Sequence, residues 1–208
     1  MTLDRHRGAR RMRLLLVPLL LALATGCQWF PGPDRDLERI ARATPVMGEG
    51  RCPPEVLADL LLRRNPALGM ERAWEVARIY IAEAAAEGVN HDLAFAQMAH
   101  ETAWLAFGGV VDPGQHNYAG IGATSDSVSG AVFPDAQTGI RAHIQHLKAY
   151  GDTTALRNPL VDPRFHLVRR GSAATLDGLT RRWATDTRYH IKIAAILKRM
   201  CPPPRPER

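Results

Sequence analysis

A single glutamate, Glu101, stands where a proton donor for acid catalysis would be expected. It comes near the end of the most apolar helical stretch of the chain, predicted from His91 to about Trp104. No Lys or Arg occurs between Arg78 and Arg141, although this window contains seven carboxylates. A carboxyl group in apolar surroundings without a neighbouring cation has a raised pKa, which suits a general acid near neutral pH. Composition alone supports two interpretations of Glu101 equally: a general acid, or a partly exposed glutamate at a helix end.

Histidines offer a second kind of chemistry, which the sequence supports less well. His143 and His146 lie one helical turn apart and could begin a zinc site, but no third ligand of suitable spacing follows them. The solvated surface of a helix explains this pair better. His91, His100 and His116 flank Glu101 and raise a zinc amidase as a rival enzyme class, but no ligand motif supports it. We therefore expect neither a metal nor a cofactor.

The elements that must position Glu101 are predicted to be mostly helical. The apolar period predicts helices over residues 54–64, 71–87, 91–104, 136–150, 174–184 and 189–200. Between Leu105 and Phe133 the helical period is lost and glycines recur. Residues 118–124 and 131–133 flank a Ser-Asp-Ser turn and predict a small β-hairpin or loop lobe. The expected fold is mainly α, a helical domain with this lobe beside the active-site cleft.

Four segments of the chain resemble one known family, in the same order. Residues 96–104 resemble the catalytic helix of bacterial peptidoglycan glucosaminidases (glycoside hydrolase family 73), in which a small-residue helix carries Glu with Trp shortly after. Residues 117–121 resemble the Asn-aromatic-Gly-Ile stretch of that family. Residues 133–140 resemble its passage from hairpin to helix, and residues 182–189 its Trp-Ala-x-Asp-x-x-Tyr segment. The resemblance covers roughly residues 71–197.

The resemblance implies a lysozyme-like α+β fold, cleavage of β-1,4 glycosidic bonds after N-acetylglucosamine, and a set of site residues. Glu101 matches the general acid, and Tyr189 matches a tyrosine that hydrogen-bonds substrate or intermediate. Substrate-binding positions that shape the cleft correspond to Trp104, Asn117, Tyr118 and Trp183. The second carboxylate of the family corresponds to Asp126 in the turn of the lobe, with Asp135 at its exit as the alternative.

The chemistry requires a proton on the leaving oxygen and stabilisation of an oxocarbenium-like centre. Glu101 can supply the proton. Either the 2-acetamido group of the substrate or water activated by Asp126 then completes the reaction. Two other functions stay open: a lytic transglycosylase, which also needs a single glutamate, and a non-catalytic wall-binding lipoprotein.

Residues 1–26 predict an export signal. The first 13 residues are rich in arginine, and the uncharged run over residues 14–24 is too short for a spanning helix of about 20 residues. Ala24-Thr25-Gly26-Cys27 resembles the lipobox of bacterial lipoproteins, in which the cysteine is lipidated. We expect a lipid anchor at Cys27, placing the protein in the cell envelope on the periplasmic side of the outer membrane, with ordinary signal cleavage as the alternative.

Lipidation of Cys27 would leave Cys52 and Cys201 as an even pair in an oxidising compartment, which predicts a disulfide between them. Residues 27–51 contain Pro and Gly without a sustained apolar period and are expected to form a tether. The catalytic domain then spans residues 52–201, followed by a Pro-rich tail over 202–208.

Charge argues against a nucleic-acid partner. Residues 1–26 contain five arginines and one aspartate, which is +4 of the formal net charge of +6. The remainder holds 22 basic and 20 acidic residues, so the positive charge belongs mostly to the export signal. The expected partners are peptidoglycan glycan strands and, through the lipid anchor, a membrane, for a protein that is a monomer.

Overall fold

The computed structural model of the protein describes residues 33–107, 112–123 and 130–200. These residues form α-helices joined by turns and three short 3-10 segments, and the described part contains isolated β-bridges rather than β-strands. The helices are α1 (Pro33–Ala43), α2 (Pro54–Arg64), α3 (Met70–Glu87), α4 (His91–Glu101), α5 (Ala136–Gly151), α6 (Leu176–Leu179) and α7 (Tyr189–Met200). No helix in these ranges is long and apolar enough to cross a membrane.

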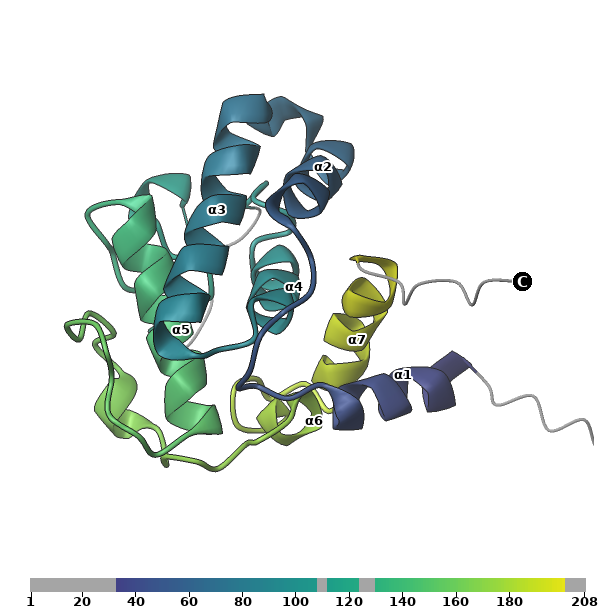
Figure 1. Cartoon of the computed structure of the whole chain (residues 1–208), viewed down its shortest axis with the longest axis vertical. Helices are drawn as coiled ribbons and strands as arrows, with labels where there is room; N and C mark the ends of the chain where they lie inside the picture. The colour runs from purple at the N-terminus through teal and green to yellow at the C-terminus, as the bar shows by residue number, and fades with distance from the viewer. Residues whose placement is uncertain (1–32, 108–111, 124–129, 201–208) are drawn as a thin grey trace, which may run out of the picture. The chain divides into compact units, whose positions relative to one another are not determined.

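Helix α4 is the centre of the fold, and it packs against α3, α5 and α7 (Figure 1). The side chain of Asn90 caps its first turn by accepting from the backbone N–H groups of Asp92 and Leu93, at 3.1 and 3.4 Å. Every residue from Leu93 to Ala99 is fully buried. The prediction that this helix is central and buried is confirmed, because an apolar surface on all sides of a helix must be covered on all sides.

Two predicted helices end earlier than their sequence suggests. Helix α4 stops at Glu101 rather than Trp104. The helix expected over residues 174–184 is reduced to the four residues of α6, because Thr180 leaves the helical conformation and Arg181 has a φ of 63°. As a result, residues 180–188 form a turn that brings Trp183 and the start of α7 together.

The tether predicted for residues 27–51 is wrong over its described part. Residues 33–43 form α1, which packs against α6 and α7. Leu37 and Ile40 contact the core, and Ala41 and Val46 are fully buried. The prediction failed because α1 is mostly charged and has only a narrow apolar stripe, which the sequence pattern does not distinguish from a solvated linker.

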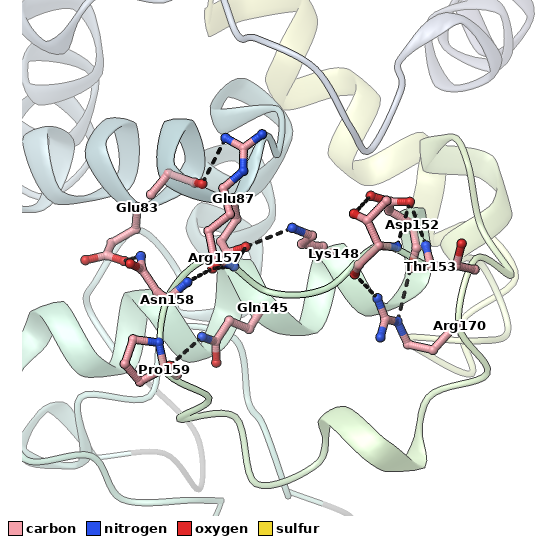
Figure 2. Close-up of polar contacts among 12 residues, drawn as sticks. Glu83, Glu87, Gln145, Lys148, Asp152, Thr153, Arg157, Asn158, Pro159 and Arg170 are labelled. Carbon is pink, nitrogen blue, oxygen red and sulfur yellow. Dashed lines mark hydrogen bonds and ion pairs between the residues drawn. The ribbon is translucent and has the colours of Figure 1, made fainter.

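The long segment between α5 and α6 is held by buried carboxylates of α3 (Figure 2). Glu87 forms an ion pair with Lys148 at 2.9 Å and accepts from the backbone N–H groups of Arg157 and Asn158. One turn earlier, Glu83 pairs with Arg141 at 2.9 Å. Charges this deeply placed persist only when they are paired and hydrogen-bonded. The network therefore fixes the segment against α3 and α5.

The predicted β-hairpin is not found among the described residues. Residues 118–123 form turns, and a backbone hydrogen bond of 2.7 Å from Ala131 to Ile121 joins the two sides of the loop. Glycine is required where this lobe meets α5, since a Cβ at Gly139 would lie 1.8 Å from the carbonyl oxygen of His116. The mainly helical fold is confirmed, and the described residues of the lobe form turns rather than strands.

Candidate active site

Glu101 is the last residue of α4, and an unusual backbone turn follows it. The backbone is left-handed at three consecutive residues, with φ values of 48° at Ala103, 62° at Trp104 and 63° at Leu105. Residues other than glycine rarely adopt this conformation. The hydroxyl of Thr102 stabilises the turn by accepting from the N–H of Leu105 at 2.9 Å. The helix consequently ends at Glu101, so that no further helical turn covers its carboxyl group. Strain of this kind often accompanies functional sites.

Glu101 is exposed as a residue, and its carboxyl lies against the side chains of Tyr189 and Trp183. The hydroxyl of Tyr189, the first residue of α7, donates to Oε1 of Glu101 at 2.6 Å. Desolvation raises the pKa of Glu101, and hydrogen bonds from Tyr189 and Trp183 oppose that rise only in part. The negative end of the α4 dipole also disfavours a carboxylate here. The raised pKa that the sequence predicts for Glu101 is therefore confirmed.

A polar pocket of about 220 Å³ lies beside Trp183. Residues 119–123 of the lobe form one wall, and His146, Tyr150, Arg164 and Arg182 complete it. His146 hydrogen-bonds Asp162 at 2.7 Å and packs its ring against Trp183, with the centroids 4.9 Å apart. Two arginines in a pocket of this size provide a site for an acidic group. A larger pocket, of about 500 Å³ between α1 and α7, contains none of the predicted site residues.

Comparison with known proteins identifies the family. Residues 77–201 match the family described as mannosyl-glycoprotein endo-beta-N-acetylglucosaminidase. The chain belongs to this glucosaminidase family. It is also 45% identical over 152 residues to an uncharacterized protein of Borreliella burgdorferi, covering 73% of this chain and 74% of that protein.

Solved structures with the same fold come from autolysin E of S. aureus. One is its complex with the muropeptide NAM-L-Ala-D-iGlu, with a TM-score of 0.50 and 15% identity over 80% of this chain and 76% of that one. The other is a catalytic glutamate-to-alanine mutant in complex with the disaccharide NAG-NAM, with a TM-score of 0.51 and 14% identity over 80% and 77% of the two chains. At this identity the likeness shows a common, lysozyme-like fold.

In this member of the family, the structure brings together three of the predicted site residues: Glu101, Tyr189 and Trp183. Asn117 is instead fully buried. Its amide nitrogen donates to the carbonyl oxygens of Ile121 and Ala131, at 2.9 and 3.1 Å, and its amide oxygen accepts from the N–H of Ile121. Asn117 therefore shapes the lobe from within.

Tyr118 and Trp104 also lie away from the Glu101 carboxyl. Tyr118 is buried, and its hydroxyl accepts from Arg72 of α3 at 2.5 Å. Trp104 faces α2, where the guanidinium of Arg64 stacks 5.1 Å from its ring, and lines a small pocket with residues of α2 and α7. Substrate contact by these two side chains stays a prediction, for which these placements provide no support.

The sequence offers two candidates for the second carboxylate, and the structure describes one of them. Asp126 lies outside the described residues. Asp135 caps α5 by accepting from the N–H of Thr138 at 2.7 Å, and this hydrogen bond lowers the pKa of its carboxyl. Asp135 thus has a structural role at the exit of the lobe. Among the described residues, no cluster of His, Cys, Asp and Glu could hold a metal ion.

The cysteines of the predicted disulfide are partly described. Cys52 is buried and disulfide-bonded. Cys27 and Cys201 lie outside the described residues, so the pairing of Cys52 with Cys201 and the lipidation of Cys27 stay predictions.

Sequence reasoning assigned His143 to a solvated helix surface, and this assignment is wrong. The side chain is fully buried beneath Trp183, with the ring centroids 5.5 Å apart. It hydrogen-bonds Gln97, which in turn donates to Tyr189. Gln97 was missed as well, although a buried glutamine one helical turn before Glu101, on the same face of an otherwise apolar helix, is a usable signal.

Proposed function

We propose that this protein is an exported peptidoglycan hydrolase that cleaves β-1,4 bonds after N-acetylglucosamine, with Glu101 as the general acid. The observation that carries the proposal is the Glu101 carboxyl itself. It has a raised pKa, a free approach from solvent and a hydrogen bond from Tyr189. Family membership supports the same reaction class.

Glu101 would protonate the leaving oxygen as the glycosidic bond breaks, because a neutral carboxylic acid can donate while a carboxylate cannot. Tyr189 and Trp183 stabilise the carboxylate that remains after proton transfer. The positive charge at the anomeric carbon would then be met by the 2-acetamido oxygen of the substrate or by water activated by Asp126. Asp135 is a poor alternative because its carboxyl already caps α5.

The pocket beside Trp183 supports an acidic glycan as the substrate. Arg164 and Arg182 line it together, and the described residues of the pocket wall include no exposed carboxylate. Peptidoglycan carries carboxylates on its stem peptides, and autolysin E binds a muropeptide and the disaccharide NAG-NAM. We assign this pocket to an acidic group of the muropeptide.

Mass spectrometry of digested peptidoglycan tests the reaction. After borohydride reduction, a glucosaminidase yields products that end in reduced N-acetylglucosamine. Reduced N-acetylmuramic acid ends would identify a muramidase instead. Intact sacculi after long incubation would contradict the proposal and favour the wall-binding lipoprotein.

A lytic transglycosylase is the second candidate, because its reaction also requires a single acidic glutamate, and Glu101 has the hydrogen bond and the raised pKa for that role. Its products carry 1,6-anhydro ends, which do not react with borohydride. The same experiment therefore separates the two enzymes.

We further propose that the mature protein begins at a lipidated Cys27 and remains attached to the envelope. Several acyl chains, at about 0.8 kcal/mol per buried methylene, would make the anchor effectively permanent. Intact-mass analysis of the membrane fraction should show the added acyl chains, and Cys27→Ser should release the protein. A soluble native protein that begins at another residue would contradict the anchor.

A further inference from the structure

A continuous chain of four hydrogen bonds runs from the interior of the domain to the acid. Tyr80 of α3 contacts Nδ1 of His143 at 2.9 Å, and Nε2 of His143 contacts Oε1 of Gln97 at 3.0 Å. The amide nitrogen of Gln97 donates to the hydroxyl of Tyr189 at 2.7 Å, and Tyr189 donates to Glu101 at 2.6 Å. Tyr80, Gln97 and His143 are fully buried, and Tyr189 nearly so.

The polarity of this chain follows from its Glu101 end. An ionised Glu101 can only accept, so Tyr189 must donate to it, and the Tyr189 oxygen is then free to accept from the amide of Gln97. That orientation turns Oε1 of Gln97 toward His143, which must carry its proton on Nε2. The bare Nδ1 then accepts from Tyr80. A flip of the Gln97 amide would require the other tautomer of His143 and would draw the Tyr189 proton away from Glu101.

We propose that Gln97 and His143 are positioning residues, which hold the Tyr189 hydroxyl so that it donates to Oε1 of Glu101 and leaves the acidic proton on Oε2. The proposal rests on the function proposed above. With Gln97 reversed, its oxygen would compete for the Tyr189 proton, and Oε1 of Glu101 would lose its donor. An acid proton confined to one oxygen faces the leaving group in a single geometry, which is what efficient proton transfer requires.

Neutrality of His143 is a condition for this arrangement. Burial lowers the pKa of His143 to about 3, helped by the neighbouring His146, so the imidazole is uncharged at any pH where the enzyme would work. A cationic imidazole would donate from both nitrogens and leave Tyr80 without an acceptor. Its charge would also lower the pKa of Glu101. Trp183 covers the His143 ring, which keeps this segment of the chain dry.

Other titratable groups lie near the chain. His100 of α4 packs edge-on against Tyr189, and its pKa is lowered by desolvation and by Lys192, with Asp186 opposing, which favours the neutral form. His146 and Tyr150 of α5 pack against the ring of Trp183, and Tyr118 faces Tyr80. Among the described residues, Glu101 is the carboxyl group at the end of this hydrogen-bond chain. A shift in the pKa of Glu101 therefore reports on the order of the chain.

A matched pair of variants at His143 tests the direction of the chain. His143→Gln puts an amide donor near the position of Nε2, where it can still donate to Gln97, whereas His143→Asn reaches only the position of Nδ1. We expect kcat to fall about tenfold or more in the Asn variant and to recover most of its value in the Gln variant, with KM unchanged in both. Equal losses in the two variants, or losses confined to KM, would overturn the positioning role.

Gln97→Met provides a second test at nearly the same size. The variant removes the amide that donates to Tyr189, so the Tyr189 hydroxyl is no longer held toward Glu101 and stabilises its charged form less. The loss of this hydrogen bond raises the pKa of Glu101. Because the acid form is required, kcat should fall while the alkaline limb of its pH profile moves to higher pH. The control is Glu87→Gln, which weakens a buried ion pair elsewhere and should lower Tm without moving that limb.

Nuclear magnetic resonance on labelled protein reads the chain without substrate. The ¹⁵N shifts of His143 should show a neutral Nε2–H imidazole from pH 5 to 9, and the ¹³C titration of Glu101 should move upward in Gln97→Met. A His143 that protonates near pH 6, or a Glu101 titration unchanged by Gln97→Met, overturns the inference. Absence of glycosidase activity in the wild-type protein would instead overturn the proposed function, while these two spectra would still report whether the chain is ordered as described.

Discussion

The Tyr189 hydroxyl donates to Oε1 of Glu101 over 2.6 Å, although 88 positions separate the two residues in the chain. The end of α4 and the beginning of α7 meet at this bond. The pair combines opposite effects on one carboxyl group, because enclosure by protein raises its pKa while Tyr189 and Trp183 lower it. A general acid needs this balance, since it must hold a proton before the reaction and release it during the reaction.

Glu101→Gln should abolish hydrolysis, with kcat reduced by about 10²–10⁴ or more, the usual contribution of a general acid. The amide has nearly the same shape and can still accept from Tyr189, so the far-UV circular dichroism and Tm should stay close to wild type. Zymography and product analysis measure the loss. Asp126→Asn should cost less if the 2-acetamido group assists the reaction, and an equal loss would indicate two essential carboxylates.

Tyr189→Phe should shift the pH dependence as well as the rate. The hydroxyl stabilises the charged form of Glu101, so its removal raises the pKa of that carboxyl. Glu101 then stays protonated to higher pH, and the alkaline limb of kcat moves upward. At the optimum, kcat should fall because the carboxyl is no longer oriented. An alkaline limb that moves downward would contradict the assignment of Glu101 as the acid.

The raised pKa of Glu101 could be predicted from the sequence because it depends on composition. The helix around Glu101 is apolar, and lysine and arginine are missing over a long window. The hydrogen bonds that tune the same carboxyl could not be predicted in this way, since Gln97 and His143 have no sequence feature that specifies their partners. Both side chains are buried, and their hydrogen bonds join them in one fixed network.

Helix boundaries likewise divide into those that the local sequence specifies and those that tertiary contacts specify. Gly88 and Asn90 are local signals, and at these residues α3 ends and α4 begins where the sequence predicts. The left-handed turn after Glu101 involves Ala103, Trp104 and Leu105, which carry no local preference for that conformation. Tertiary contacts impose it, and α1 likewise is stable only because α6 and α7 cover its narrow apolar stripe.

Removal of the pocket arginines should weaken binding to acidic substrates selectively. In the double variant Arg164→Met, Arg182→Met, KM for peptidoglycan fragments should rise about tenfold, while neutral chito-oligosaccharides should be cleaved as by wild type. Salt should reduce the difference, because it screens exposed charges. The matched control is Arg63→Met on α2, which removes a cation far from the pocket in the fold. An equal rise in KM for neutral glycans would argue against an acidic ligand.

Lys148→Met should destabilise the domain by about 3–5 kcal/mol, because it leaves the buried Glu87 without its cation. Burial raises the pKa of Glu87, but donors from Asn158, Arg157 and Lys148 outweigh it and lower the pKa below the ordinary value of 4.5. The wild-type network therefore contributes stability above that value and loses it as the pH falls through the lower, folded-state pKa. Urea unfolding at pH 7 and pH 3 should show a smaller difference between variant and wild type at the lower pH. Arg63→Met, at an exposed pair, should cost less than about 1 kcal/mol.

Reduction of the disulfide should lower the stability of the domain without removing its activity at low temperature. Cys52 is buried and disulfide-bonded, and Cys201 is its expected partner because Cys27 is expected to carry lipid. A bridge between them would close a loop of about 150 residues, which contributes on the order of 4–5 kcal/mol in the chain-entropy model. Both cysteines are remote in sequence from Glu101, so Cys52→Ala, Cys201→Ala should lower Tm by about 10–20 °C and leave kcat at 20 °C close to wild type. Peptide mapping under non-reducing conditions identifies the partner: a peptide joining Cys52 to Cys27 would contradict both the bridge to Cys201 and the lipid anchor, because one sulfur cannot carry the lipid and form a disulfide at once.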